Sequence, residues 1–396
     1  MDPLLLLVHR LPYPPNKGDK IRSFNLLKYL SKYYSVYLGT FVDDPYDWKY
    51  VNNLDKYCKS VYVRPLNKKR STVKSLKGFF SGESLSICYY RDSAMQAWCH
   101  KIIEKEKIRK VIVFSSSMAQ YVAGPEYSYM KRIIDFVDID SDKWSQYEKS
   151  KSWPLNTLYR REARKLLQME CKIAWEFNQS FFVSEAERDM FKQLCNNLNT
   201  ISHYDNGVDY EYFSCQGSLE NPYAQSQTIV FTGAMDYWAN INAVLWFTNN
   251  IFPRIKKHIT NVVFYIVGSN PVESIKDLGK MDGVVVTGRV DDVRPYIQYA
   301  CLSVAPLRIA RGVQNKVLEA MSMGVCIVAT SFAIKGLKKL SGDEALFVED
   351  DETGFSKSCI KLLKTCNTGF AESNRQYILK NYNWKKNLEL ITECIE

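Results

Sequence analysis

The residue types best suited to chemistry lie close together in the second half of the chain, in residues 305–324. An apolar run ends at Ala305 and a loop with two arginines follows. The pattern then predicts a helix that begins near Asn315 and ends at Gly324. Free amides at a helix start, with cationic side chains close by, form a favourable site for a diphosphate. We therefore predict a diphosphate site in this loop and helix start.

Glu319 extends the predicted site. It lies slightly more than one helical turn after Asn315, where a carboxylate can accept hydrogen bonds from the ribose hydroxyls of a nucleotide. The alternative is a solvated basic loop followed by a glutamate on the helix surface. With a glycine that ends a strand of the same half, the residues expected to hold the nucleotide are Gly233, Arg308, Arg311, Gly312, Val313, Asn315, Lys316 and Glu319.

The first half offers candidates for catalysis. In the loop after the first strand, Gly18 would let the backbone approach a phosphate or a sugar, and Lys20 would add positive charge. An ordinary turn between strand and helix is the alternative. Asp138 and Asp140 straddle the end of another strand, where one of them can orient or partly deprotonate a hydroxyl, or cap a helix. The predicted catalytic residues are Asp138, Gly18 and Lys20.

Residues 64–80 combine six basic residues with Leu, Val and Phe. This composition is typical of a segment that lies on an anionic bilayer, and a solvated loop is the alternative. Residues 1–200 carry 33 Lys+Arg and 22 Asp+Glu, a net +11, whereas residues 201–396 carry 20 and 21, a net −1. The residues expected to contact a membrane or an acceptor are Lys68, Lys69, Arg70, Lys74, Lys77, Phe79 and Phe80.

These side chains need a scaffold, and the hydrophobic pattern predicts one in each half. In the first half the predicted strands are Leu4–Val8, Val36–Phe41, Val111–Phe114, Ile133–Val137 and Ser180–Val183, and the predicted helices are Ile21–Ser31 and Asn156–Glu176. In the second half the predicted strands are Thr228–Thr232, Val262–Val267, Val284–Thr287, Leu302–Ala305 and Val325–Thr330. This alternation predicts an α/β fold with doubly wound, mostly parallel sheets.

The bulk composition sets further bounds. A chain of 396 residues with 46% hydrophobic and 24% charged residues is typical of a globular protein with two domains. No stretch approaches the roughly 20 apolar residues of a spanning helix, and the run Leu4–Val8 resembles a buried strand more than a signal peptide. We expect a cytoplasmic protein, peripherally associated with the inner face of the membrane. The eleven scattered cysteines favour reduced thiols, and no cluster of ligands indicates a metal.

Three motifs resemble those of glycosyltransferase family four. The donor-binding signature is matched by Lys316–Met321, Gly324 and Ile327–Thr330, the interdomain motif by Asn206–Asp209 and Phe213, and the C-terminal aromatic element by Tyr382–Trp384. The resemblance implies the GT-B fold, which has two Rossmann-like doubly wound domains with a cleft between them. The acceptor-binding domain would be residues 1–205, joined by the C-terminal helix 384–396, and the nucleotide-sugar-binding domain residues 206–383.

A longer resemblance covers nearly the whole chain. The segments His9–Arg22, Thr40–Asp44, Asp135–Asp138, Asp140–Trp144 and Thr232–Trp238 are similar to the sugar transferases associated with exosortase/PEP-CTERM exopolysaccharide systems. It implies a retaining enzyme of exopolysaccharide biosynthesis that uses a nucleotide diphosphate-sugar and no metal or other cofactor. We expect as partners a glycan or polyprenyl-diphosphate-linked acceptor and, from the charge split and residues 64–80, an anionic membrane surface. Nucleic acid is not expected, because no recognised motif accompanies the positive charge.

The sequence departs from family four at the donor site. The family usually has a glutamate eight residues before Glu319, where this chain has Arg311, and its Arg and Lys are missing around Gly233–Asn242. We therefore expect Arg308, Arg311 and Lys316 to supply the charge for the diphosphate. Two alternatives remain: a nucleotide-sugar 2-epimerase on the same fold, which needs no lipid acceptor, and a non-catalytic binder of an anionic surface.

Overall fold

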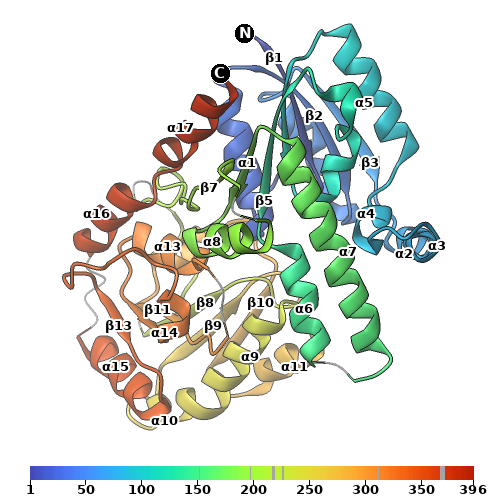
Figure 1. The fold of residues 1–396 in the computed structure, drawn as a ribbon. Coiled ribbons are helices and arrows are strands. Elements are labelled where there is room, and N and C mark those ends of the chain that lie inside the picture. The colour runs from blue at the N-terminus through green and yellow to red at the C-terminus, as the bar shows by residue number, and fades with distance from the viewer. Residues whose placement is uncertain (151, 197, 216–218, 225–226, 310–311, 366–370) are drawn as a thin grey trace. The chain divides into compact units, whose positions relative to one another are not determined.

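The computed structural model describes residues 1–150, 152–196, 198–215, 219–224, 227–309, 312–365 and 371–396. The chain divides into two compact units (Figure 1). Unit 1 comprises Met1–Asp205 and Lys385–Glu396, and unit 2 comprises Asn206–Trp384. Each unit is built on its own parallel sheet, in agreement with the α/β class that the sequence predicts.

The sheet of unit 1 has the strand order β3-β2-β1-β4-β5-β6-β7, with every neighbouring pair parallel. Its strands are β1 (Pro3–Val8), β2 (Ser35–Val42), β3 (Ser60–Pro65), β4 (Lys110–Phe114), β5 (Lys131–Val137), β6 (Gln179–Phe182) and β7 (Ile201–His203). The five strands predicted here are confirmed. The edge strands β3 and β7 were not predicted. Because the chain moves outward from β1 to β3 and then returns to place β4 beside β1, the winding direction reverses between β1 and β4.

Helices cover both faces of this sheet (Figure 1). They are α1 (Gly18–Leu30), α2 (Lys68–Ser75), α3 (Lys77–Ser81), α4 (Leu85–Tyr89), α5 (Ser93–Lys105), α6 (Asp140–Ser150), α7 (Leu155–Glu176), α8 (Glu185–Leu194) and α17 (Trp384–Ile395), with the 3₁₀ segments η1 (Pro45–Leu54), η2 (Ser116–Tyr121) and η3 (Pro125–Tyr127). The buried side of α7 carries Glu162, Leu166, Glu170 and Ile173, which recur at helical spacing. Two of these four buried residues are carboxylic acids, which need partners inside the protein.

Unit 1 also contains a disulfide between Cys171 of α7 and Cys195, the residue after α8, whose Cα atoms lie 5.5 Å apart. The prediction that the cysteines are reduced is therefore wrong for this pair. The two residues lie 24 positions apart without a local motif, and only the packing of the chain brings them together. The other cysteines of the described residues are free thiols, buried or half-buried.

The sheet of unit 2 has the order β10-β9-β8-β11-β12-β13, again with parallel neighbours. Its strands are β8 (Thr228–Thr232), β9 (Val263–Val267), β10 (Val284–Gly288), β11 (Leu302–Ala305), β12 (Ile327–Ala329) and β13 (Leu346–Val348). The five predicted strands are confirmed, and β13 is an additional edge strand. The winding direction reverses here between β8 and β11.

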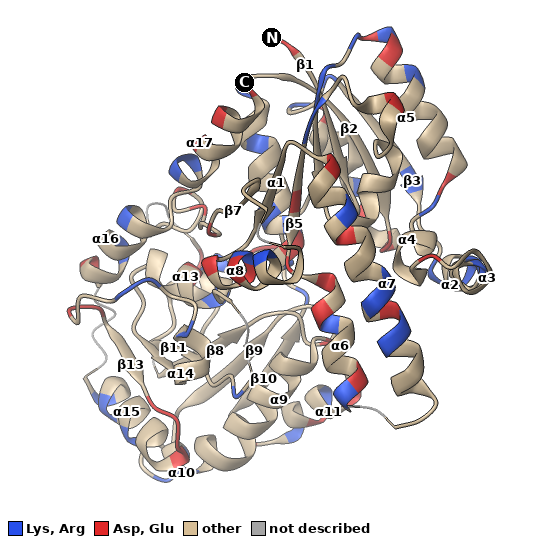
Figure 2. Ribbon diagram, in the orientation of Figure 1, with Lys and Arg blue, Asp and Glu red and all other residues tan. Residues whose placement is uncertain are grey.

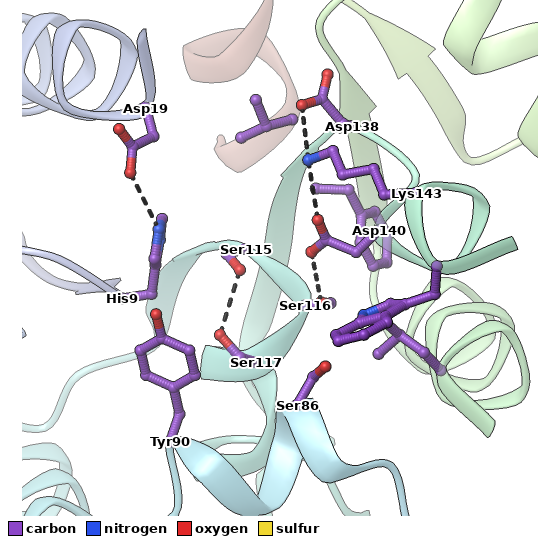
Figure 3. Close-up of a pocket in the computed structure, with 14 residues that line it drawn as sticks. His9, Asp19, Ser86, Tyr90, Ser115, Ser116, Ser117, Asp138, Asp140 and Lys143 are labelled. Atoms are coloured by element: carbon purple, nitrogen blue, oxygen red, sulfur yellow. Dashed lines mark hydrogen bonds and ion pairs between the residues drawn. The ribbon is translucent and has the colours of Figure 1, made fainter. Parts of the chain in front are cut away.

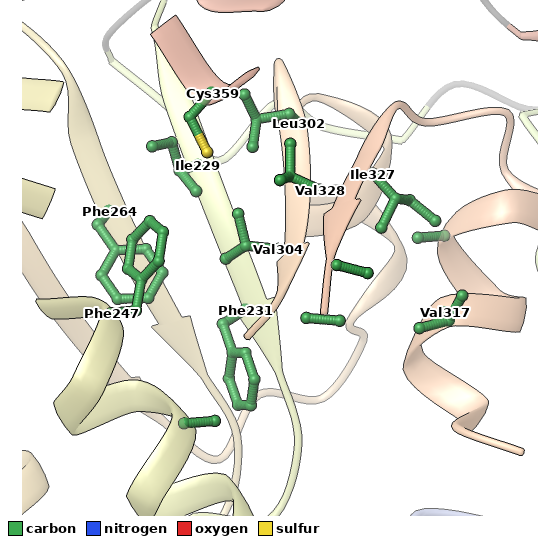
Figure 4. Close-up of a cluster of buried hydrophobic side chains, with 14 of the residues drawn as sticks. Ile229, Phe231, Phe247, Phe264, Leu302, Val304, Val317, Ile327, Val328 and Cys359 are labelled. Atoms are coloured by element: carbon green, nitrogen blue, oxygen red, sulfur yellow. The ribbon is translucent and has the colours of Figure 1, made fainter. Parts of the chain in front are cut away.

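The core of unit 2 places the helix of the predicted nucleotide site. The cluster of buried side chains at its centre includes Phe231, Phe247, Phe264 and Val304 (Figure 4). Val317 of α13 (Asn315–Ser322) belongs to the same cluster. Burying one such side chain stabilises the fold by about 1.5–3 kcal/mol, so the apolar face of α13 holds the helix against the sheet. The other helices are α9 (Trp238–Trp246), α10 (Phe252–Lys256), α11 (Glu273–Lys276), α12 (Arg294–Gln298), α14 (Ser331–Ile334), α15 (Glu352–Lys364) and α16 (Glu372–Asn381), with a π segment η4 (Phe247–Ile251) and a 3₁₀ segment η5 (Asp277–Lys280).

The C-terminal helix packs within unit 1. Thr392 Oγ1 lies 3.2 Å from the hydroxyl of Tyr29 on α1, and Asn387 Nδ2 donates to the carbonyl of Asp205 at 2.9 Å. Within the described part of the chain, no helix combines the length and the apolar character needed to span a bilayer.

Candidate functional site

In unit 2, two glycines shape the carboxyl ends of neighbouring strands. Gly233 follows β8 with a φ of +154°, and a Cβ at this position would lie 2.7 Å from Asn240 Nδ2. Gly268 follows β9 with a φ of +156°, and a Cβ there would lie 1.6 Å from the carbonyl oxygen of Gly233. Only glycine fits at these two positions. No side chain therefore covers the backbone at the carboxyl ends of β8 and β9, where ligands usually bind to α/β sheets.

Lys316 brings an ammonium group to the bare backbone of Gly233. Its Nζ donates to Asn240 Oδ1 at 2.7 Å and lies 3.9 Å from the centroid of the Phe231 ring. A Cβ on Gly233 would lie 3.2 Å from the same Nζ. Burial lowers the pKa of Lys316 to about 7, although the charge of Glu319 acts in the opposite direction. The ammonium therefore loses its proton more readily than an exposed lysine does, and an anionic ligand beside it would stabilise the charged form.

Glu319 lies three residues after Lys316, on the same side of α13. Burial raises the pKa of its carboxyl group to about 7, and the charge of Lys316 opposes this shift. Each group thus stabilises the charged form of the other. One helical turn therefore presents a cation and a hydrogen-bond acceptor at the carboxyl end of the sheet, a combination suited to the phosphate and hydroxyl groups of a nucleotide.

The other predicted nucleotide-site residues surround this turn. Arg308 is exposed, donates from Nε to Asn242 Oδ1 at 3.1 Å, and has its guanidinium 5.6 Å from the Trp246 ring centroid. Asn315 begins α13, and its buried Oδ1 has no hydrogen-bond partner among the described residues. Gly312 is exposed with a φ of +60°, and the half-buried Val313 packs against the core. Arg311 lies outside the described residues.

Unit 1 contains a separate pocket of about 360 Å³. It lies at the carboxyl ends of β1, β4 and β5, beside the point where the winding direction reverses (Figure 3). Parallel α/β sheets bind ligands at this point. The pocket is lined by His9, Asp19, Ser86, Tyr90, Ser115, Ser116, Ser117, Phe136, Val137, Asp138, Asp140, Lys143, Trp144 and Leu166.

The backbone of this pocket is strained at two strand ends. Ser115, after β4, has a φ of +79°, and Val137, at the end of β5, has a φ of +70°. Such a conformation costs about 1–3 kcal/mol for a residue other than glycine, and it is rare for a β-branched side chain. The buried Asp135 holds both residues, because its carbonyl accepts from Ser115 N at 2.8 Å and its Oδ1 accepts from Val137 N at 3.1 Å. Strain of this kind concentrates at functional sites.

Three charged side chains form a network along one wall of the pocket (Figure 3). Lys143 Nζ lies 2.9 Å from Asp138 Oδ2 and 3.1 Å from Asp140 Oδ1, and Asp140 Oδ2 accepts from the hydroxyl of Ser116 at 3.2 Å. Burial lowers the pKa of Lys143, but the charges of Asp140 and Asp138 outweigh burial and raise that pKa above its usual range. Lys143 is therefore fixed as a cation, and it orients both carboxylates.

A second charged group lines the pocket beside His9. Asp19 Oδ2 lies 3.3 Å from His9 Nε2 and accepts from Arg10 NH1 at 2.5 Å, while Arg10 Nε also donates to Asp43 Oδ2 at 3.0 Å. Burial raises the pKa of Asp19, but the hydrogen bond from His9 and the charge of Arg10 outweigh it and hold the pKa well below its usual range. The His9 ring stacks on Phe114 with the ring centroids 5.9 Å apart.

Helix α7 supports this pocket through two fully enclosed glutamates. Glu162 accepts hydrogen bonds from Ser84 Oγ, Leu85 N and Ser86 N at 2.6–2.8 Å, and so caps the start of α4. Glu170 accepts from Ser141 N at 3.3 Å and from Ser141 Oγ at 2.5 Å, at the start of α6. The side chains that these two helices contribute to the pocket are Ser86, Asp140, Lys143 and Trp144.

Among the predicted catalytic residues, only Asp138 lines this pocket. Lys20 is 2% exposed and donates from Nζ to Asp47 Oδ2 of η1 at 2.6 Å, so its ammonium is held in a buried ion pair. Gly18 is the exposed first residue of α1, and the next residue, Asp19, reaches the pocket instead.

Sequence reasoning missed the three serines that follow β4, and it gave Lys143 and Trp144 no role. Ser115, Ser116 and Ser117 form a polar run directly after an apolar strand, which is the signal that could have identified them. Lys143 and Trp144 lie one helical turn after Asp140, on the face of α6 that also lines the pocket.

The basic segment, residues 64–80, contains two short helices, α2 and α3. Phe80 is 95% exposed, Val73 is 69% exposed, and the guanidinium of Arg161 lies 4.8 Å from the ring centroid of Phe79. Arg161 NH2 also donates to the carbonyl of Gly78 at 2.6 Å, which ties α3 to α7. Basic residues gather on α2 and along α7 (Figure 2). Both apolar and basic side chains are thus exposed on this segment.

Within the described residues, no three His, Cys, Asp or Glu side chains lie close enough together to bind a metal ion.

Comparison with known proteins gives this geometry a family context. Residues 226–365, which include the Lys316–Glu319 turn, match the family described as "Glycosyl transferases group 1". A curated relative from Klebsiella pneumoniae, described as "Uncharacterized 44.6 kDa protein in cps region", is 22% identical and aligns over 95% of both chains.

Solved structures share the fold over nearly the whole chain. The glycosyltransferase WaaG, described as involved in lipopolysaccharide biosynthesis, is 14% identical with a TM-score of 0.68, and 99% of each chain is covered. The Anabaena protein Alr3699/HepE in complex with UDP-glucose is 12% identical with a TM-score of 0.67, also with 99% coverage of each chain. Sucrose-phosphate synthase from Thermosynechococcus elongatus is 14% identical with a TM-score of 0.68, over 99% of this chain and 98% of that chain. The predicted GT-B class, with two Rossmann-like domains, is confirmed.

Proposed function

We propose that this protein is a retaining glycosyltransferase that moves a sugar from a nucleotide diphosphate-sugar to a glycan or lipid-linked acceptor. The observation that carries the proposal is the arrangement of Lys316, Asn240 and Gly233 beside Glu319, inside the region that matches group 1 glycosyltransferases. The structure of HepE with UDP-glucose, a protein of the same fold, supports a nucleotide sugar as the ligand of unit 2.

In the proposed reaction, unit 2 stabilises the departing nucleoside diphosphate. Negative charge develops on the diphosphate as the bond to the sugar breaks, and Lys316, with the free amides at the start of α13, neutralises it. The partial burial of Lys316 strengthens this interaction, because its charge is screened less by water. Glu319 accepts hydrogen bonds from the ribose hydroxyls and fixes the register of the nucleotide. The transfer requires no metal ion and no other cofactor.

Unit 1 holds the acceptor in this proposal. Asp138 lies in the pocket, half-exposed, and Lys143 orients it from 2.9 Å. A carboxylate in this position accepts a hydrogen bond from the attacking hydroxyl and increases its nucleophilicity. The configuration of the anomeric carbon is retained when the acceptor hydroxyl attacks from the face that the diphosphate leaves, as the resemblance to family four implies.

The cellular setting is proposed from the surface of unit 1 and from the relatives. The exposed basic and aromatic side chains of α2 and α3 would hold a cytoplasmic enzyme at the inner face of an anionic membrane, where a polyprenyl-diphosphate-linked acceptor lies. A role in exopolysaccharide biosynthesis agrees with the cps region named for the Klebsiella pneumoniae relative.

A thermal-shift screen of the full-length protein with nucleotide sugars tests the proposal. A ligand that binds the folded state raises the melting temperature, so at least one nucleotide sugar and its nucleoside diphosphate should raise it. Lys316→Ala and Glu319→Ala should each reduce the affinity by at least about 1 kcal/mol, the scale of a charge-assisted hydrogen bond. A folded protein that none of these nucleotides stabilises would contradict the proposal. Conversion of the nucleotide sugar into its epimer, without transfer, would favour the epimerase instead.

A further inference from the structure

We propose that the pocket of unit 1 binds an uncharged sugar ring, held by Asp138, Asp140 and Trp144, and that it excludes phosphate groups. The lipid diphosphate of a linked acceptor would then lie outside this pocket, and the pocket would receive the terminal sugar. The inference rests on the proposed function in calling this sugar the acceptor. The chemistry of the pocket argues for its ligand class independently.

The charges of the pocket disfavour an anion. Three carboxylates line it, Asp19, Asp138 and Asp140, against the single ammonium of Lys143. Lys143 already lies 2.9 Å and 3.1 Å from the last two carboxylates, and the guanidinium of Arg10 is bonded to Asp19 and Asp43. A phosphate in this pocket would meet three carboxyl groups, and the cations beside them are already paired, which is unfavourable in a partly buried site.

The polar groups of the pocket match the hydroxyls of a sugar. Carboxylates accept hydrogen bonds, and a serine hydroxyl both donates and accepts. Ser116 already donates to Asp140, and the hydroxyls of Ser115 and Ser117 lie 3.2 Å apart (Figure 3). A sugar hydroxyl can also donate and accept at once, so one uncharged ring can bond to several of these groups without bringing a charge into the pocket.

The apolar part of the pocket suits the faces of a sugar ring. Trp144 is half-buried and packs against Tyr159, with the ring centroids 5.4 Å apart. The rings of His9 and Tyr90 also line the pocket, with their centroids 5.9 Å apart (Figure 3). Leu166 of α7 belongs to the same lining. The C–H groups of a sugar pack on aromatic faces because the π-system carries partial negative charge. At about 360 Å³, the cavity is large enough for a small ligand.

The test measures binding of sugars to the full-length protein by saturation-transfer NMR and competition. The probes are the methyl glycosides of glucose, galactose and mannose, and the 6-phosphates of the same sugars. At least one methyl glycoside should bind, and its 6-phosphate should bind about tenfold more weakly or worse. Asp140→Asn should weaken binding of the glycoside by about tenfold, the scale of one hydrogen bond to a charged group. Trp144→Ala should weaken it by about tenfold as well, because the sugar loses the aromatic face on which it packs.

Asp142→Asn is the matched control, because Asp142 lies on the same helix and bonds to Gln146 outside the pocket lining. This variant should bind the glycoside as well as the unchanged protein does. Stronger binding of the sugar phosphates, no binding of any glycoside, or equal affinity of Asp140→Asn and Asp142→Asn would overturn the inference. Nucleoside diphosphate binding, measured in the same samples, reports on unit 2. If the nucleotide binds and the glycosides do not, the inference alone fails. If no nucleotide binds, the proposed function fails.

Discussion

Glu170 provides a prediction that can be worked out from the structure. Its carboxyl group is 0% exposed on α7, and its hydrogen-bond partner is Ser141. Burial raises its pKa from 4.5 to about 8, and the nearby charge of Asp140 adds to the shift, although the hydrogen bonds from Ser141 oppose it. The folded state therefore keeps this group protonated at neutral pH, whereas the unfolded chain ionises it.

The sign of the pH effect follows from this difference. Between about pH 4.5 and 8, the folded state holds a proton that the unfolded state has lost, so the contribution of Glu170 to stability falls as the pH rises. The fall amounts to about 1.4 kcal/mol for each pH unit, or roughly 4 kcal/mol between pH 5 and pH 8. Glu170→Gln removes the ionisation and can still form both hydrogen bonds, because its amide oxygen accepts from Ser141 N and its amide nitrogen donates to Ser141 Oγ.

Calorimetric melting of the full-length protein and the Glu170→Gln variant measures this effect. The variant should gain stability over the unchanged protein as the pH rises from 5 to 8, by about 2 to 4 °C in melting temperature for each kcal/mol. Glu162→Gln is the matched control on the same helix. It should destabilise the protein, because Glu162 accepts from three donors that a neutral amide cannot all satisfy. A difference between Glu170→Gln and the unchanged protein that is independent of pH would refute the reasoning.

Three further predictions concern ligand and membrane binding. Gly233→Ala should weaken nucleoside diphosphate binding at least about tenfold in calorimetric titration, because its Cβ would displace Asn240 and Lys316; unchanged affinity would contradict this. Affinity for the diphosphate should fall as the pH rises above about 7, because Lys316 loses its charge there, and Lys316→Met should remove this dependence. Replacing the five basic residues of α2 and α3 with glutamine should release the protein from anionic vesicles, because each charge contributes about 1 kcal/mol to the free energy of membrane binding. Nucleotide affinity should not change. Equal sedimentation of the variant and the unchanged protein with these vesicles would contradict the membrane assignment. The five residues are Lys68, Lys69, Arg70, Lys74 and Lys77.

The predictable part of the fold follows local patterns. Nine of the ten predicted strands are short apolar runs that are mostly buried, because a parallel sheet is covered on both faces, whereas β10 lies at a sheet edge and is mostly half-exposed. The unpredicted strands β3, β7 and β13 lie at sheet edges, where the strands are less buried, and β7 and β13 have only three residues each. The disulfide between Cys171 and Cys195 could not be predicted either, because these two residues meet only through tertiary packing.

The candidate sites were predictable to different degrees. The turn that carries Lys316 and Glu319 could be recognised, since both residues are close in sequence and follow a strand. By contrast, the partner of Lys20 is Asp47, which is 27 residues away in sequence. The sequence predicted that Lys20 faces a ligand, and its burial depends on a contact that no local pattern encodes.

The central claim is that unit 2 holds a nucleoside diphosphate at the start of α13. Hydrogen–deuterium exchange of the full-length protein, with and without the nucleotide that raises its melting temperature, tests this claim most directly. We predict protection of residues 232–240 and 312–319, because the ligand would contact the backbone after β8 and the start of α13. Protection confined to unit 1, or none in these two segments at saturating nucleotide, would contradict the account.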